Sequence, residues 1–173
     1  MKTERLLLRR FTPNDLEDLV ALDSDPEVMS FITGGRATPR EQVEGEILPA
    51  FIAGGYWACI ERVSGDFIGW FHLRPSGEPE LGYRLRREVW GRGYATEGSR
   101  ALIDHAFTHG AARVHAETMV AHVDSRRVME KAGMLEVRRF HADWPDRLPG
   151  DELGDVEYAI TREEWLARTH DLE

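Results

Sequence analysis

The stretch Val89-Trp90-Gly91-Arg92-Gly93-Tyr94-Ala95-Thr96-Glu97 joins an extended segment to a helix through a turn that contains two glycines. Residues 80–85 before it predict a strand, and the apolar residues after Gly93 recur at helical spacing as far as Gly110. Glycines let the backbone approach a ligand closely, and a helix N-terminus presents unpaired N–H groups. The stretch therefore predicts an anion site, most simply for a phosphate or pyrophosphate, with nearby arginines adding positive charge.

The glycine spacing excludes two common nucleotide-binding motifs. A P-loop needs Gly-x-x-x-x-Gly-Lys-Ser/Thr, and the sequence contains no such run. A dinucleotide fingerprint needs a third glycine at the position of Thr96 and a parallel strand before the turn. A plain glycine turn without a ligand stays open as the alternative.

Three threonine-led segments predict the starts of helices. Thr12 precedes a proline and lies three residues before Asp15, which suits an N-cap. Residues 38–41 form a potential capping box, with a helix expected to about Phe51. Residues 161–164 repeat the pattern near the C-terminus.

The remaining pattern predicts an α+β domain. Strands are expected over residues 4–10, 56–63, 67–73, 80–85, 113–120, 134–140 and 156–160. A short helix is expected over residues 125–132, and loops over residues 75–79 and 143–155. Consecutive hairpin strands combined with β-α-β crossovers favour one mixed, mostly antiparallel central sheet flanked by helices, in a single domain over residues 1–173.

The amino-acid composition limits the classes of molecule that the protein is expected to bind. Lys and Arg total 22 against 31 Asp and Glu, for a net charge of −9, which excludes the basic face that nucleic acids require and weakly favours cationic partners such as amines. Apolar stretches near the roughly 20 residues of a membrane span are absent from the sequence. With Cys59 as the single cysteine, an intrachain disulfide and a cysteine-based metal site are excluded, and a cytoplasmic location is expected.

The glycine stretch resembles the acetyl-coenzyme A pyrophosphate loop of the GNAT acetyltransferases, in particular their RimJ/RimL-like branch. Residues 6–9, 25–29, 80–83, 125–134 and 155–165 resemble further segments of that branch in the same order. The resemblance implies a GNAT-like domain that transfers an acetyl group from acetyl-CoA to a primary amine, either a protein N-terminus or a small molecule. It also implies direct attack in a ternary complex, with a backbone N–H near Leu85 polarising the carbonyl. The residues that it places at the donor are Leu85, Arg86, Arg87, Val89, Trp90, Gly91, Arg92, Gly93, Tyr94, Ala95, Thr96, His122 and Ser125.

Two positions depart from the family pattern. Glu88 stands where Gln or Arg is common, so we expect backbone N–H groups, with Arg87, to supply the binding. His122 stands where the branch usually has Asn, and its hydrogen-bonding reach differs. A domain that binds acetyl-CoA without catalysis, as a sensor or interaction partner, therefore stays open as a second hypothesis.

Three side chains are candidates for proton transfer. Glu80, on the strand before the loop, is the first candidate for the general base, with a solvated strand-end carboxylate as the alternative. His72 is the second, because its ordinary pKa of roughly 6.5 suits proton transfer, although surface histidines are common. Ser125 matches the serine that the branch places near the sulfur as a proton donor, with an N-cap role as the alternative.

Other reactive side chains are expected to have no catalytic role. Cys59 lies mid-strand, so a buried inert thiol is expected rather than an acyl-enzyme. His105 and His109 have the spacing of a zinc motif, but Ala106 replaces its glutamate, and we expect no metal. A homodimer is left open.

Overall fold

The computed structural model describes residues 1–74, 78–145 and 147–170. The chain divides into two compact units, one formed by Met1–His72 and Tyr83–Gly98, the other by Leu73–Gly82 and Ser99–Glu173. Most of the predicted loop at 75–79, namely residues 75–77, lies outside the described residues, as does one position of the predicted 143–155 loop.

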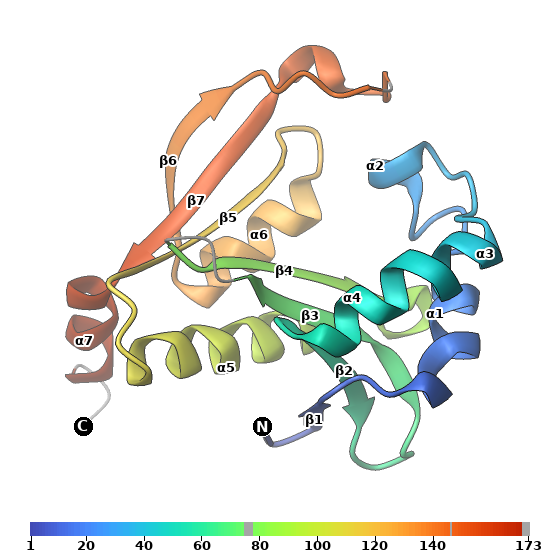
Figure 1. The fold of residues 1–173 in the computed structure, drawn as a ribbon. Coiled ribbons are helices and arrows are strands. Elements are labelled where there is room, and N and C mark those ends of the chain that lie inside the picture. Colours follow the sequence, from blue (N-terminus) through green and yellow to red (C-terminus); the bar gives the residue numbers. More distant parts are fainter. Residues whose placement is uncertain (75–77, 146, 171–173) are drawn as a thin grey trace. The chain divides into compact units, whose positions relative to one another are not determined.

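The described strands form one mostly antiparallel sheet, as predicted. Their bounds are β1 Leu6–Arg9, β2 Tyr56–Glu61, β3 Phe67–Arg74, β4 Glu80–Leu85, β5 Arg113–Met119, β6 Leu135–Phe140 and β7 Asp155–Thr161. Their order is β1-β2-β3-β4-β5-β7-β6 (Figure 1). β4 and β5 pair in parallel, whereas β1–β2, β2–β3, β5–β7 and β6–β7 are antiparallel. The fold is therefore α+β, with a mixed sheet and flanking helices.

The first unit builds a core between its helices and the strands β2 and β3. Its helices are the 3-10 turn Pro13–Asp15, α1 Leu16–Leu22, α2 Ser30–Thr33, α3 Arg40–Gln42, a π-helical segment Val43–Ile47 and α4 Leu48–Ala53. α4 contacts β2, and its Phe51 packs with Phe11 and Trp70 in the buried core. Pro49 lacks an N–H, which suits the change of hydrogen-bond register just before it.

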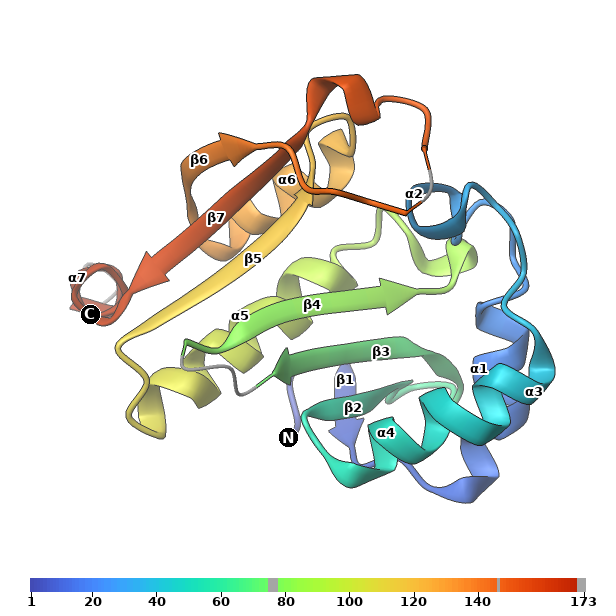
Figure 2. The ribbon, with the colours of Figure 1, turned by 45° about the horizontal axis from the view of Figure 1, so that its top comes forward.

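The second unit places helices beside the three strands β5, β7 and β6, which lie side by side (Figure 2). α6 Val123–Ala132 ends at Gly133, as predicted, and is followed by the 3-10 turn Asp151–Leu153 and α7 Arg162–His170. α5 Tyr94–Thr108 starts in the first unit and continues in the second. Among the described helices, each is too short or too polar to cross a membrane.

Two of the predicted helix starts are confirmed and one is wrong. Asp15 accepts the Thr12 N–H at 2.8 Å, and Glu164 accepts the Thr161 N–H at 2.8 Å. Thr38 does not cap α3, because the helix takes Pro39 as its N-cap and the Thr38 N–H donates to the Asp23 carbonyl at 3.0 Å. A contact with a distant segment overrides the local capping pattern there.

Candidate active site

The predicted anion loop lies between β4 and α5. β4 ends at Leu85, a 3-10 turn spans Arg87–Val89, and α5 begins at Tyr94. Gly91 and Gly93 have φ angles of +71° and +82°. The Glu97 N–H donates to the Gly93 carbonyl at 3.0 Å, and the N–H groups that precede it in the helix have no carbonyl one turn earlier.

Space beside Gly91 makes the loop suitable for a bulky anion. A Cβ atom placed on Gly91 would meet nothing within 4 Å. The open space and the N–H groups of the α5 N-terminus meet two needs of a phosphate or pyrophosphate site, which are close backbone approach and aligned donors.

The arginines around the loop are engaged with carboxylates. Arg86 Nη2 donates to Asp18 Oδ1 at 2.6 Å, and Arg87 pairs with Glu27. Because these ion pairs compensate much of the positive charge, the backbone N–H groups supply more of the attraction for an anion than the arginine side chains do.

The end of β4 is held by two hydrogen bonds on one peptide unit. The Trp90 indole N–H donates to the Leu85 carbonyl at 2.9 Å, and the Arg86 N–H donates to the Ile68 carbonyl at 2.8 Å. The Arg86 N–H is thus engaged, so the Leu85 N–H is the better candidate to polarise a substrate carbonyl.

His72 is buried in the first unit, so the alternative of a surface histidine does not apply. Its ring lies 5.2 Å from the Tyr56 ring and 5.7 Å from the Trp70 ring, and only 8% of the residue is exposed. A histidine in this aromatic setting is fixed in orientation by packing.

Glu80 lies at the start of β4 in the second unit. Its carboxylate pairs with Arg74, and its backbone is in register with His115 of β5. The side chain is 26% exposed, so it is partly shielded rather than freely solvated at a strand end.

Glu117 is a further candidate for the general base, which the sequence did not indicate. It follows His115 by two residues on β5, so both side chains are on one face, and it lies opposite Glu157 of β7. Glu157 is held by Arg113 and by Arg138 Nε at 2.5 Å, whereas Glu117 has Arg138 only at 3.7 Å. In the sequence, the only indication of this pair is a His-x-Glu pattern on a predicted strand. The pattern does not show that Glu117 lies opposite Glu157 of β7.

The surroundings raise the pKa of Glu117 above its ordinary value. Partial burial is the largest cause, the negative charges of Glu157 and Glu80 add to it, and His115 and Arg138 oppose it. A carboxylate with a raised pKa is a better proton acceptor near neutral pH, which makes Glu117 suitable for general-base chemistry.

Glu117→Gln is expected to stabilise the protein at pH 8. A raised folded-state pKa means that the stability contributed by Glu117 is full below its unfolded pKa and is lost as the pH rises through the folded pKa. Glutamine removes that loss, so thermal unfolding at pH 8 should shift upward by about 1–3 °C, with no shift at pH 3, where the group is protonated in both states. Glu46→Gln, on the exposed surface, is the control, and an unchanged melting temperature of Glu117→Gln at pH 8 would contradict the account.

The N-cap role considered for Ser125 is wrong. α6 begins at Val123 with His122 as its N-cap, and the Arg126 N–H donates to the His122 carbonyl at 3.2 Å. Ser125 is the third residue of the helix and is buried. Its hydroxyl is therefore not needed to start the helix.

His122 is held mainly in its neutral form. Burial lowers its pKa, and the charge of Asp124 opposes this only in part. Its Nδ1 lies 3.4 Å from Thr118 Oγ1. A neutral imidazole can donate and accept hydrogen bonds, as an asparagine side chain can.

Cys59 is buried, as predicted. Burial, with the nearby Glu97 charge, raises the pKa of its thiol to about 12. The thiol is therefore protonated at neutral pH and a poor nucleophile. Across the described ranges, groups of three His, Cys, Asp or Glu side chains that could hold a metal ion are absent.

Comparison with known proteins identifies the family. The model of the acetyltransferase (GNAT) domain matches residues 5–135. The chain belongs to the GNAT acetyltransferase family. As a GNAT acetyltransferase, it is an N-acetyltransferase that takes its acetyl group from acetyl-CoA.

Individual relatives cover nearly the whole chain. The FsC-acetyl coenzyme A-N(2)-transacetylase of Aspergillus fumigatus is 35% identical over 182 residues, covering 96% of this chain and 77% of the relative. A GNAT acetyltransferase structure from Bacillus anthracis superposes with a TM-score of 0.81 at 25% identity, covering 94% of this chain and 98% of that one. The spermidine N-acetyltransferase of Vibrio cholerae, solved with CoA and spermine, gives a TM-score of 0.78 at 15% identity and covers 95% of this chain and 99% of that one. The predicted GNAT fold and the use of acetyl-CoA are thereby confirmed.

Proposed function

We propose that this chain, as one domain of the RimJ/RimL-like branch, acetylates a primary amine by direct attack on acetyl-CoA in a ternary complex. The observation that carries the proposal is the open turn at Gly91, which combines space for a pyrophosphate with the free N–H groups of α5. The acceptor is a small-molecule amine or a protein N-terminus.

Direct transfer is supported by the state of the only cysteine. Bound acetyl-CoA supplies the thioester carbonyl and the thiolate leaving group. A buried Cys59 with a thiol pKa of about 12 is unsuited to carry the acetyl group first. The amine itself is therefore the nucleophile in this proposal.

Carboxylates of the second unit supply the acceptor chemistry. An ammonium group must lose a proton before it attacks. Glu80 on β4 and Glu117 on β5 are candidate proton acceptors, and the negative charge of Glu80 helps to raise the pKa of Glu117. Their negative charge attracts a cationic amine, and Glu117 has the raised pKa of a proton acceptor. In this proposal Glu80 or Glu117 is the base, His72 is the second candidate, and Ser125 donates a proton to the thiolate.

The name of the A. fumigatus relative supports a nitrogen acceptor, since it specifies an N(2)-transacetylase. The test is thiol release from acetyl-CoA with diamines, polyamines, amino sugars and N-terminal peptides. We expect thiol release with at least one amine. We also expect acetyl-CoA to raise the melting temperature without an amine present. Stabilisation without turnover across the panel would favour the sensor hypothesis, and stabilisation by ATP or NAD but not acetyl-CoA would contradict the proposal. The cytoplasmic location and the homodimer stay predictions.

Ser125→Ala is expected to lower kcat about tenfold while the dissociation constant of CoA stays within about twofold, because a proton donor to the leaving group acts in the reaction rather than in binding. Steady-state kinetics and calorimetric titration with CoA measure the two quantities. Ser99→Ala is the matched control, since Ser99 is also a buried helical serine. Weaker CoA binding with an unchanged kcat would show that Ser125 is structural.

A further inference from the structure

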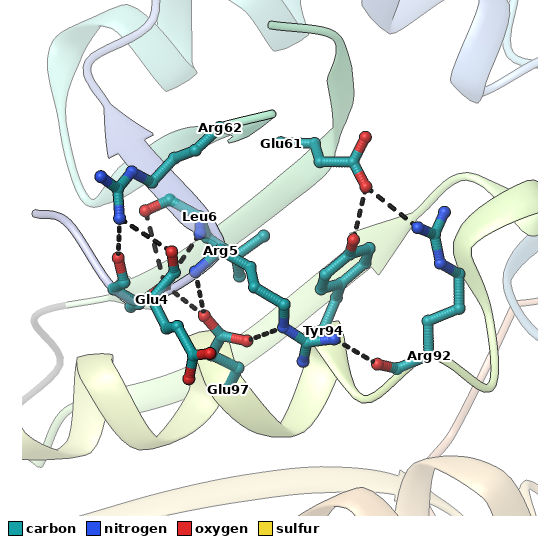
Figure 3. Close-up of polar contacts among 9 residues, drawn as sticks. Glu4, Arg5, Leu6, Glu61, Arg62, Arg92, Tyr94 and Glu97 are labelled. Atoms are coloured by element: carbon teal, nitrogen blue, oxygen red, sulfur yellow. Dashed lines mark hydrogen bonds and ion pairs between the residues drawn. The ribbon is translucent and has the colours of Figure 1, made fainter. Parts of the chain in front are cut away.

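Residues 3–5, just before β1, contact the Gly91–Thr96 loop, which we call the donor loop, through the side chain of Arg5. The Arg5 guanidinium donates from Nη1 to the Arg92 carbonyl at 2.8 Å and from Nε to Glu97 Oε2 at 2.7 Å (Figure 3). Glu97 Oε1 also accepts the Arg5 backbone N–H at 2.8 Å and the Thr3 hydroxyl at 2.5 Å. One guanidinium thus joins the middle of the loop to the first turn of α5.

The bond to the Arg92 carbonyl has a geometric consequence for the loop. The peptide unit between Arg92 and Gly93 is planar and trans, so its C=O and N–H point in opposite directions. A carbonyl held by Arg5 therefore directs the Gly93 N–H away from Arg5. A loop that binds an anion through N–H groups needs this orientation, because an inward carbonyl would repel the anion.

Glu97 keeps Arg5 in place as a charged partner. Burial would raise the pKa of Glu97, but the hydrogen bonds from Thr3 and from the backbone and side chain of Arg5 outweigh it and hold the pKa below its ordinary value. The carboxyl is 17% exposed, so it is largely shielded from competing water. The Arg5 guanidinium is thereby fixed by Glu97 at Nε and by the Arg92 carbonyl at Nη1.

A second contact holds the same turn from β2. The Tyr94 hydroxyl donates to Glu61, and Arg92 Nη2 lies 3.2 Å from Glu61 Oε1. The Tyr94 ring lies against both guanidinium groups, with Arg5 Cζ 4.4 Å and Arg92 Cζ 5.0 Å from its centroid (Figure 3). The turn is thus attached to β2 through Glu61 and to the segment just before β1 through Arg5.

We propose that Arg5 is a positioning residue for acetyl-CoA, which sets donor affinity by holding the Arg92 carbonyl and so orienting the loop N–H groups. The proposal assumes that the Gly91–Thr96 loop is the donor site. A loop held in its binding conformation before the donor arrives loses less entropy on binding. In this proposal Arg5 acts on CoA affinity through the backbone of the loop.

Calorimetric titration with CoA tests this on purified full-length variants. Arg5→Gln is expected to raise the dissociation constant about tenfold, since it removes charge-assisted hydrogen bonds that orient the loop. The dissociation constant of Arg5→Lys should lie between those of the wild type and Arg5→Gln. One ammonium group cannot bind Glu97 and the Arg92 carbonyl together as the planar guanidinium does. Tyr94→Phe, which loses only a hydroxyl, should give a smaller rise of a few-fold and serves if Arg5→Gln does not fold.

Arg62→Gln is the matched control. Arg62 Nη1 donates to the carbonyls of Thr3 and Glu4 at 2.7 and 2.8 Å, so it ties the same N-terminal segment without reaching the loop. It should lower the melting temperature and leave the CoA dissociation constant within twofold. Amide hydrogen exchange without donor should accelerate over residues 91–96 in Arg5→Gln and not in Arg62→Gln.

The outcomes separate a positioning role from a merely structural one. A higher KM for acetyl-CoA with an unchanged KM for the amine supports positioning. Wild-type CoA affinity in both Arg5→Gln and Tyr94→Phe, with a melting temperature lowered as in Arg62→Gln, would overturn the inference. If the wild-type protein binds CoA but acetylates no amine, the proposed function fails while the Arg5 inference stands.

Discussion

Gly91→Val is expected to weaken CoA binding at least about 100-fold, an affinity loss of about 2.7 kcal/mol. The glycine has a φ of +71°, which a β-branched residue adopts at high cost, and the space that its missing side chain leaves open is where the anion is proposed to sit. The two methyl groups of valine would fill that space and force the turn to change. Calorimetric titration of the purified variant with CoA measures the effect.

Gly65→Val separates backbone strain from loss of the site. Gly65 lies in the turn between β2 and β3 with a φ of +78°, and a Cβ there would also meet nothing within 4 Å. The two substitutions should therefore cost comparable stability, and Gly65→Val should bind CoA as the wild type does. CoA affinity retained by Gly91→Val would refute the loop as the donor site.

Gly69→Ala is expected to destabilise the fold by about 3 kcal/mol or more, because overpacking against rigid backbone cannot be relieved by a side-chain rotation. A Cβ on Gly69 would lie 2.1 Å from the Arg84 carbonyl oxygen and 2.7 Å from the Leu85 Cα, and the φ of +141° adds strain. β3 and β4 would have to separate near the end of β4, which leads into the glycine turn at Gly91 and Gly93. The substitution should thus also weaken CoA binding by displacing Leu85.

Urea unfolding followed by tryptophan fluorescence measures the loss. Gly45→Ala is the control, since a Cβ at that helical glycine would meet nothing within 4 Å. It should leave stability unchanged or slightly raised. A loss below about 1 kcal/mol in Gly69→Ala would show that the two strands separate easily, which is unusual for paired strands.

Local sequence patterns predicted the elements closely. β4 has the predicted bounds, and the other strands and α5 differ from the predictions by a few residues at their ends. Capping worked at Thr12 and Thr161, where the carboxylate three residues later accepts the threonine N–H. It failed at Thr38, where the backbone bonds to Asp23, and the four-residue helix α2 was missed because it is too short for a periodic signal.

By itself the sequence determined the α+β class, the glycine turn between a strand and a helix, and a single inert cysteine, because each depends on neighbouring residues and their periodicity. Only the tertiary structure decided which distant side chains meet. The pKa of Glu117 is raised because packing partly buries its carboxyl and strand pairing places Glu157 opposite it, and Arg5 reaches Glu97 across 92 residues. Spacing along the chain encodes local conformation, whereas the partners of a charged side chain follow from how the strands and helices pack.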